Sequence, residues 1–312
     1  MPEPAAGAEG ELRRFIFEHH PIRGFWIRLD SAWRELRSFQ HYPPAVETLL
    51  GEAVGAALLL AATLKFRGTL TLQLAGDGGV KLLVAQCTHD FNVRAVARTD
   101  EGVHEGSDEG MHEPLTFKQL VGDGRLTVTI ESEERSARYQ GIVSLEGNSL
   151  AQCLESYFAT SEQLSTRLVL LADSACVSGL LIQKMPAASN QGEAQAAVSQ
   201  GVWEEAQVQL QSLEPSLLRA GSARQLLQRI CGGEDSRLFP SMPVRFNCRC
   251  SGARVANVLR ALGSQEIHDI LSEQGAVTVT CEFCGRPYRY DVIDVERLFS
   301  QAASPETPQS LN

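Results

Sequence analysis

The chain has 312 residues, enough for one large hydrophobic core and one or more smaller units. Its 28 lysines and arginines are outnumbered by 38 aspartates and glutamates, which gives a net charge of −10. Since this charge repels phosphate backbones and anionic lipids, the composition argues against nucleic acid and membranes as partners.

The N-terminal segment and the longest apolar run indicate where the protein resides. Residues 1–10 contain neither the basic run nor the apolar stretch of a secretory signal, and we expect them to form a flexible terminus. The apolar run at residues 53–64 stops at Lys65 and is shorter than the ~20 residues that cross a bilayer. We therefore expect a buried helix and a cytoplasmic protein.

A central core helix is predicted over residues 43–64, where apolar residues recur at helical spacing after two prolines. Short segments of alternating apolar and polar residues follow, separated by glycine-rich turns, and predict half-buried antiparallel strands. These segments lie near residues 70–74, 93–95, 126–130 and 141–145.

A helix at about residues 149–160 and apolar strands at 167–171 and 179–183 complete the first domain. We expect it to span residues 11–186 and to be of the α+β class, with an antiparallel or mixed sheet and packed helices. His19 and His20, which follow an apolar strand-like run, are expected on the surface or in a hairpin.

No phosphate-binding loop is present, because none of the four lysines belongs to a G-x-x-x-x-G-K-[ST] motif. The glycine-rich residues 76–79 stand between two strand patterns and predict a hairpin turn. An ATP-driven protein that uses such a loop is therefore excluded.

A helical linker is predicted between the first domain and the C-terminal module, over residues 187–243. Its first part, residues 187–200, is rich in Ala, Ser, Gln and Gly and offers little to anchor a core. Its second part has apolar stripes that predict helices docked on a neighbouring surface. The stripes are Trp203, Ala206, Leu210 and Leu213, and then Leu226, Leu227 and Ile230.

The last unit, residues 244–300, reads as a small zinc-binding α/β module: an extended cysteine segment, a helix, two short strands around a second cysteine turn, and a closing helix. Residues 301–312 are expected to be a flexible tail.

Four of the eight cysteines stand alone: Cys87, Cys153, Cys176 and Cys231. The others form a C-x-C pair, Cys248 and Cys250, and a C-x-x-C pair, Cys281 and Cys284. Tetrahedral zinc needs four such soft ligands from two converging segments, so the spacing predicts that these four thiolates bind one zinc ion.

The site has rivals: two structural disulfides, a thiol–disulfide oxidoreductase that uses the C-x-x-C pair, and a zinc ribbon that binds nucleic acid. Four protein ligands leave no open metal position, so a zinc hydrolase is disfavoured. Residues 244–300 hold seven arginines and seven acidic residues, which gives no basic face for nucleic acid.

Zinc holds the sulfurs as thiolates, the form that oxidants attack, and it stabilises a module with little core of its own. Residues 246–251 (FNCRCS) and 281–288 (CEFCGRPY) resemble the redox-switch signature of the thirty-three-kilodalton heat-shock chaperone family. Four N-terminal segments resemble the same family: residues 63–68, 76–78, 138–141 and 161–164.

The resemblance implies an ATP-independent holdase, not an enzyme, that binds unfolding client proteins under oxidative stress. It implies that the zinc-bound form is inactive and monomeric. Oxidation then forms the disulfides Cys248–Cys250 and Cys281–Cys284, releases zinc, unfolds the module with its metastable linker and gives an active homodimer. The linker composition and Cys231 depart from the family pattern.

Overall fold

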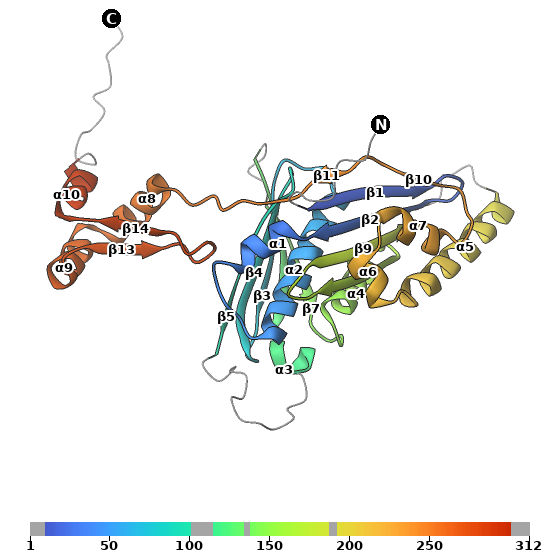
Figure 1. Cartoon of the computed structure of the whole chain (residues 1–312), viewed down its shortest axis with the longest axis horizontal. Coiled ribbons are helices and arrows are strands. Elements are labelled where there is room, and N and C mark those ends of the chain that lie inside the picture. Colours follow the sequence, from blue (N-terminus) through green and yellow to red (C-terminus); the bar gives the residue numbers. More distant parts are fainter. Residues whose placement is uncertain (1–9, 101–114, 134–137, 187–191, 301–312) are drawn as a thin grey trace, which may run out of the picture. The chain divides into compact units, whose positions relative to one another are not determined.

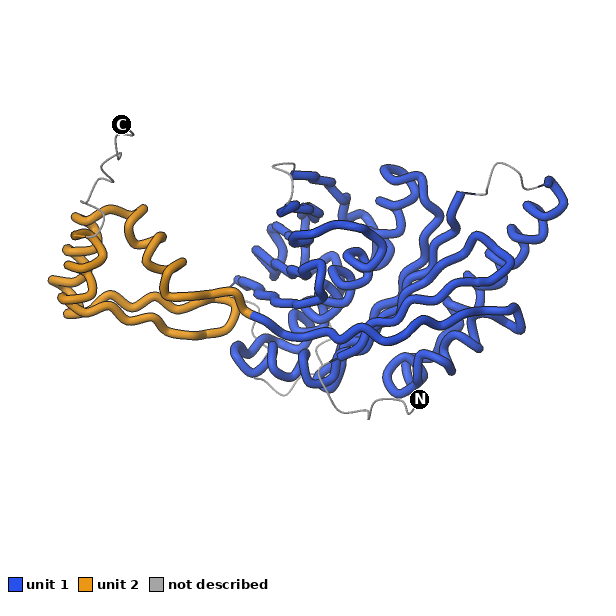
Figure 2. The backbone as a smooth tube through the Cα atoms, turned by 90° about the horizontal axis from the view of Figure 1, so that it is seen from above, with its two compact units in different colours: residues 1–247 blue, residues 248–312 orange. Residues whose placement is uncertain are grey.

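The computed structural model describes residues 10–100, 115–133, 138–186 and 192–300. The predicted flexible segments, residues 1–9 and 301–312, lie outside these ranges. The chain forms two compact units, unit 1 (residues 1–247) and unit 2 (residues 248–312), which Figure 2 colours separately. The fold is of the predicted α+β class, with antiparallel and mixed sheets.

Unit 1 contains two six-stranded sheets and most of the helices (Figure 1). The first sheet has the order β10-β1-β2-β9-β8, with β11 also paired to β1, and all its pairs are antiparallel. Its strands are β1 (Glu11–Phe17), β2 (Ile22–Leu29), β8 (Thr166–Ala172), β9 (Val177–Lys184), β10 (Ser236–Leu238) and β11 (Met242–Pro243).

The second sheet has the order β12-β5-β4-β3-β6-β7, and only the β12–β5 pair of this order is parallel. Its strands are β3 (Gly68–Ala75), β4 (Val80–Thr88), β5 (Asn92–Thr99), β6 (Arg125–Ser132), β7 (Arg138–Ser144) and β12 (Arg245–Phe246). The glycine-rich residues 76–79 connect β3 to β4, so the predicted hairpin turn is confirmed.

Helix α2 (Pro44–Thr63) is the predicted core helix, and its buried residues join the cores of both sheets in one cluster. It is long and apolar enough to cross a membrane, but 72% of its most apolar stretch is buried inside the protein. The helix therefore serves as the core of unit 1. Shorter helices flank the sheets: α1 (Ser31–Arg37), α3 (Phe117–Val121) and α4 (Leu150–Thr160).

Glu52 is an acidic residue in the middle of this apolar helix, and burial raises the pKa of its carboxyl from 4.5 to about 7. Folded unit 1 then binds a proton more tightly than the unfolded chain, so stability falls as pH rises from about 4.5 to 7. Glu52→Gln should therefore stabilise the protein at pH 8 by up to about 3 kcal/mol, and hardly at all at pH 4.5. Urea unfolding of both proteins at the two pH values measures this; an equal gain at both would contradict it.

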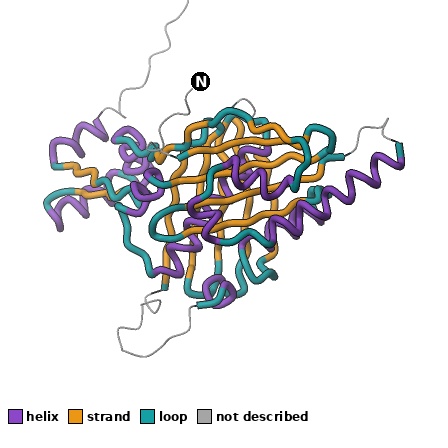
Figure 3. The backbone as a smooth tube through the Cα atoms, turned by 45° about the vertical axis from the view of Figure 1, so that its right-hand side comes forward, coloured by secondary structure: helices purple, strands orange, loops and turns teal. Residues whose placement is uncertain are grey.

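Three helices of the predicted linker pack on the face of the first sheet that points away from α2 (Figure 3). They are α5 (Glu193–Gln211), α6 (Pro215–Ala220) and α7 (Ala223–Cys231). Trp203, Leu210 and Ile230 bury their side chains with Phe15 and Trp26 of the sheet in a second core, separate from that of α2. The first sheet therefore has a hydrophobic core on each of its faces.

The composition of residues 187–200 predicted little that could anchor a core, yet the described part of this segment, residues 192–200, contains a buried residue. Helix α5 begins at Glu193, and Ser199 in its second turn is 1% exposed. The described part of this segment has no large buried apolar side chain, but a polar contact of the buried Ser199 holds it in place. Residues 187–191 lie outside the described ranges.

Unit 2 has a small core and few elements, in the order that the sequence predicts apart from one additional helix, α9. The elements are α8 (Gly252–Leu262), α9 (Ser264–Gln274), β13 (Val277–Thr280), β14 (Pro287–Tyr290) and α10 (Val292–Ser300). Its core cluster has six buried residues: Leu259, Ile267, Leu271, Val277, Val295 and Leu298. So small a core supplies limited stability without a further cross-link.

Candidate metal centre

Cys248 and Cys250 lie on an extended segment that leads into α8. Ser251 ends this segment and caps the helix, since its hydroxyl accepts a hydrogen bond from the Arg254 amide at 3.3 Å. The Arg254 guanidinium also donates to the Arg249 carbonyl at 2.7 Å, between the two cysteines. These contacts fix the backbone that presents both thiols.

Cys281 and Cys284 lie in the turn that joins β13 to β14. The Cys281 amide donates to the Arg286 carbonyl at 2.9 Å, and the Gly285 amide donates to the Cys281 carbonyl at 2.8 Å. Gly285 has φ 63°, a left-handed conformation that glycine adopts without strain. Gly285 therefore lets the backbone turn tightly just after Cys284.

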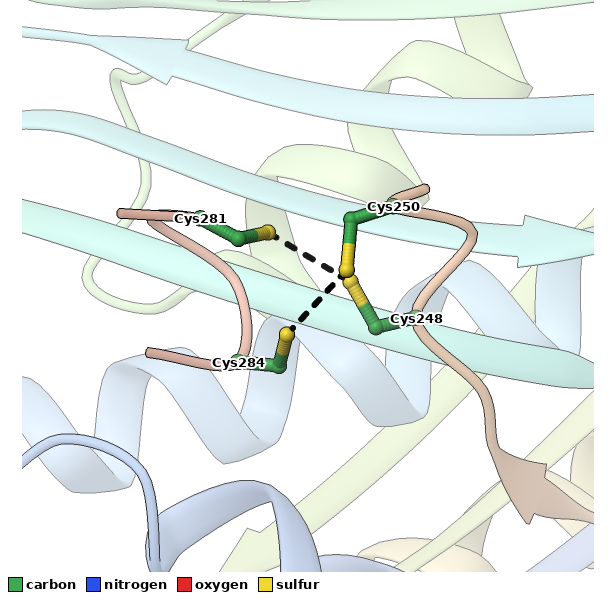
Figure 4. A group of neighbouring side chains, drawn as sticks. All are labelled: Cys248, Cys250, Cys281 and Cys284. Carbon is green, nitrogen blue, oxygen red and sulfur yellow. Dashed lines mark hydrogen bonds between the residues drawn. The ribbon is translucent and has the colours of Figure 1, made fainter. Parts of the chain in front are cut away.

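The four thiols converge, as Figure 4 shows, with all Sγ atoms within 4.8 Å of one another. Cys248 Sγ lies 3.6 Å from Cys281 Sγ, and Cys250 Sγ lies 3.5 Å from Cys284 Sγ. Four sulfurs at 2.3 Å from a tetrahedral zinc would be about 3.8 Å apart. The cluster therefore has the donor set and the spacing to hold a metal ion, and its four cysteines are free thiols.

The thiols of this cluster differ in their readiness to ionise. Burial disfavours the Cys250 thiolate, but interactions with the nearby Tyr288 side chain and with the other three cysteines outweigh burial and lower the pKa of Cys250 to about 7. Burial raises the pKa of Cys284 to about 12. Burial also raises the pKa of Cys248. Sequence spacing gave no sign that Tyr288 would act on one particular thiol.

The isolated cysteines are buried in unit 1 and take no part in the cluster. Cys87, Cys153, Cys176 and Cys231 are free, and burial raises the pKa of each. Within the described ranges, no other group of His, Cys, Asp and Glu side chains gathers as a metal site would require. Cys231, the last residue of α7, belongs to the core between helices α5 to α7 and the first sheet.

Comparison with known proteins agrees with the architecture of both units. The family model described as "Hsp33 protein" matches residues 10–291. A protein named 33 kDa chaperonin from Nitrosococcus oceani is 41% identical over 297 residues, which covers 95% of this chain and 96% of the relative. Its counterpart from Chromobacterium violaceum is 40% identical and covers 93% of each chain.

A solved structure has the same fold. The crystal structure of the 33 kDa chaperonin from Thermotoga maritima superposes with a TM-score of 0.78 and 22% sequence identity. The match covers 94% of this chain and 98% of that one. These comparisons confirm the resemblance first seen in the cysteine segments.

Proposed function

We propose, from the premise that this chain belongs to the Hsp33 or 33 kDa chaperonin family, that it is an ATP-independent holdase switched on by oxidation of its four-cysteine cluster. The family is one of molecular chaperones and is non-enzymatic, so the chain is a chaperone and the oxidoreductase hypothesis is set aside. The observation that carries the proposal is the convergence of four thiols, from two segments, in a unit with a six-residue core.

The metal in this proposal is zinc, held by Cys248, Cys250, Cys281 and Cys284. When bound, zinc keeps the four sulfurs as thiolates and ties the segment before α8 to the β13–β14 turn. The four-sulfur donor set and the sulfur spacing support this assignment. With all four ligands from the protein, the site has a structural and not a catalytic character.

The oxidised state in this proposal contains the disulfides Cys248–Cys250 and Cys281–Cys284. Each pair of thiolates gives two electrons to peroxide or hypochlorite and forms one S–S bond, while protons from the solvent complete the reduction of the oxidant to water or to chloride and water. The sulfurs of a disulfide no longer bind the metal as thiolates, so Zn²⁺ is released. Bonds within each pair leave the two segments free to separate. Bonds across the pairs would keep the segments joined, so they would not release the fold.

Unfolding of the module, residues 244–300, then releases the helices of the linker, residues 187–243, from the domain at residues 11–186. When these helices detach, solvent would reach the side chains that pack against α5 to α7 in the folded state: Phe15, Trp26, Leu180 and Ile182. A contiguous apolar surface of this kind captures unfolding proteins. We place this activity in the cytoplasm, with a monomer in the reduced state and a homodimer in the oxidised state.

The test follows four signals during oxidation of the zinc-loaded chain: zinc release, circular dichroism, sedimentation and light scattering of a denatured client. Suppression of client aggregation is expected to begin only as zinc leaves and helical signal falls, and reductant should reverse it. If the reduced zinc form protects the client equally well, the switch does not exist. Mass spectrometry of the oxidised chain reads the disulfide pairing.

A further inference from the structure

His20, in the connection between β1 and β2, is the second of two adjacent histidines, and its side chain is only 6% exposed. Its Nδ1 atom lies 3.0 Å from the Ser199 hydroxyl on α5, and its Nε2 atom lies 3.1 Å from a carboxylate oxygen of Glu234 after α7. The sequence predicted a surface or hairpin residue. The hairpin position is correct, but the ring lies between two parts of the linker.

The hydrogen-bond roles follow from the partners. A carboxylate only accepts, so the ring donates from Nε2 to Glu234, and in the neutral ring Nδ1 then accepts from the Ser199 hydroxyl. Ser, His and Glu are also the residue types of a hydrolase triad. Here Ser199 is 1% exposed, so a substrate cannot reach its hydroxyl, and the contact has a holding function.

Residues next to His20 also connect the β1–β2 hairpin to the chain that follows α7. Glu18 accepts two hydrogen bonds from Arg237, at 2.7 and 2.9 Å, and its amide donates to the Asp235 carbonyl at 2.9 Å. His19, by contrast, is 67% exposed and lies 3.4 Å from an Asp235 carboxylate that is 80% exposed. An exposed pair of this kind contributes little to stability, whereas the bond of His20 to the buried Ser199 contributes more, and its bond to Glu234, which is 41% exposed, lies between the two.

The position of Ser199 gives the contact its importance. The first turns of α5 carry no large apolar anchor, since Trp203 is the first such residue of the helix to be buried. Among the buried contacts of the linker, the one between His20 and Ser199 is therefore closest in sequence to the end of β9. Glu234 fastens the other end, where α7 has ended and β10 is about to begin.

We propose that His20 is a positioning residue that fastens both ends of the linker helices to the first sheet and so sets how readily they are released. The inference rests on the proposed function only in taking the helices of the linker, residues 187–243, as the part that is released. It adds to the cysteine cluster a second site that controls activation, and this site lies in unit 1 and involves no cysteine. A chain without this fastening would need less oxidant for activation.

Amide hydrogen exchange in the reduced, zinc-loaded full chain tests the proposal, with variants that remove one bond at a time. His20→Asn places its amide where Nδ1 lies and keeps only the Ser199 bond; His20→Gln reaches where Nε2 lies and keeps only the Glu234 bond. His20→Phe keeps a ring and removes both bonds. His19→Asn is the matched control, because it changes the exposed neighbour.

In His20→Phe, exchange should accelerate at least about tenfold in α5 and in α7, as expected from the loss of two net hydrogen bonds. His20→Asn should affect α7 more, His20→Gln should affect α5 more, and His19→Asn should match the parent. Ser199→Ala, which leaves the hairpin intact, should reproduce the α5 effect. Unchanged exchange in His20→Phe and Ser199→Ala, or equal acceleration throughout β3 and β6, would overturn the proposal.

The oxidant dose for half-maximal client protection is the second readout, and it should fall in His20→Phe. If exchange responds as expected but no variant, nor the parent, ever protects a client, the proposed function fails while the fastening stands. If clients are protected after oxidation but exchange in α5 and α7 ignores His20, the fastening fails and the function stands.

Discussion

Cys281→Ser is expected to abolish tight zinc binding and to unfold unit 2 while unit 1 stays folded. Serine is a poor zinc ligand, and three remaining thiolates would leave the tetrahedron incomplete. Structural zinc supplies roughly 10 kcal/mol or more to small modules, far more than a six-residue core can replace. The measurements are zinc stoichiometry and a heteronuclear NMR spectrum, in which unit 2 signals should collapse to unfolded positions.

Cys231→Ala is the matched control for this prediction. Cys231 is buried in unit 1 and outside the cluster, so its replacement should leave one zinc per chain and a folded unit 2. A Cys281→Ser protein that retains zinc with unchanged affinity would refute the ligand assignment. Loss of zinc in Cys231→Ala would show that the cluster is not complete with four residues.

Trp203→Ala should give a chaperone that protects clients without oxidant. The Trp203 side chain is buried in the core that joins α5 to the first sheet. Truncation of a buried tryptophan costs about 3–5 kcal/mol. Because that loss falls on the contact between linker and sheet, α5 to α7 should detach in the reduced state while zinc stays bound.

A substitution two residues before Trp203 should have the opposite effect on activation. Gly201 is exposed in the middle of α5, and a Cβ atom there would meet nothing within 4 Å apart from the neighbouring backbone of its own helix. Gly201→Ala should stabilise the helix by roughly 0.5–1 kcal/mol and delay activation. Light scattering of a client, measured for both variants against an oxidant series, checks both directions. If Trp203→Ala stays silent until oxidised, release of α5 to α7 is not the activating step.

The metal centre could be predicted because its pattern is local and chemically specific. Two cysteine pairs, each within four residues, predicted the donor set, and their position on two segments predicted that the segments converge. Helix α2 was equally clear, because its apolar residues continue for five turns with prolines at the start. Such features depend on neighbours in the chain.

Elements whose pattern depends on tertiary contacts escaped prediction. The bounds of strand β4 were not predicted, although the hairpin turn at residues 76–79 implies a strand after it, because Leu82, Leu83 and Val84 interrupt the alternation that identifies a half-buried strand. The burial of His20 could not be foreseen, since its partners are 179 and 214 residues away in sequence. For the same reason, the composition of residues 193–200 gave no sign that Ser199 would be buried.

The linker helices are tied to the first sheet at both ends by strands and not only by their own packing. Strand β9 precedes them, and β10 and β11 pair with β1 after them. About 50 residues between Lys184 and Ser236 thus form a closed loop, whose ends stay near the sheet even when its helices detach. Docking is then an intramolecular event with an effective concentration in the millimolar range. A bound client therefore competes with the chain's own linker helices for the same apolar surface. Once the thiols are reduced, these helices should pack on that surface again without the help of another protein.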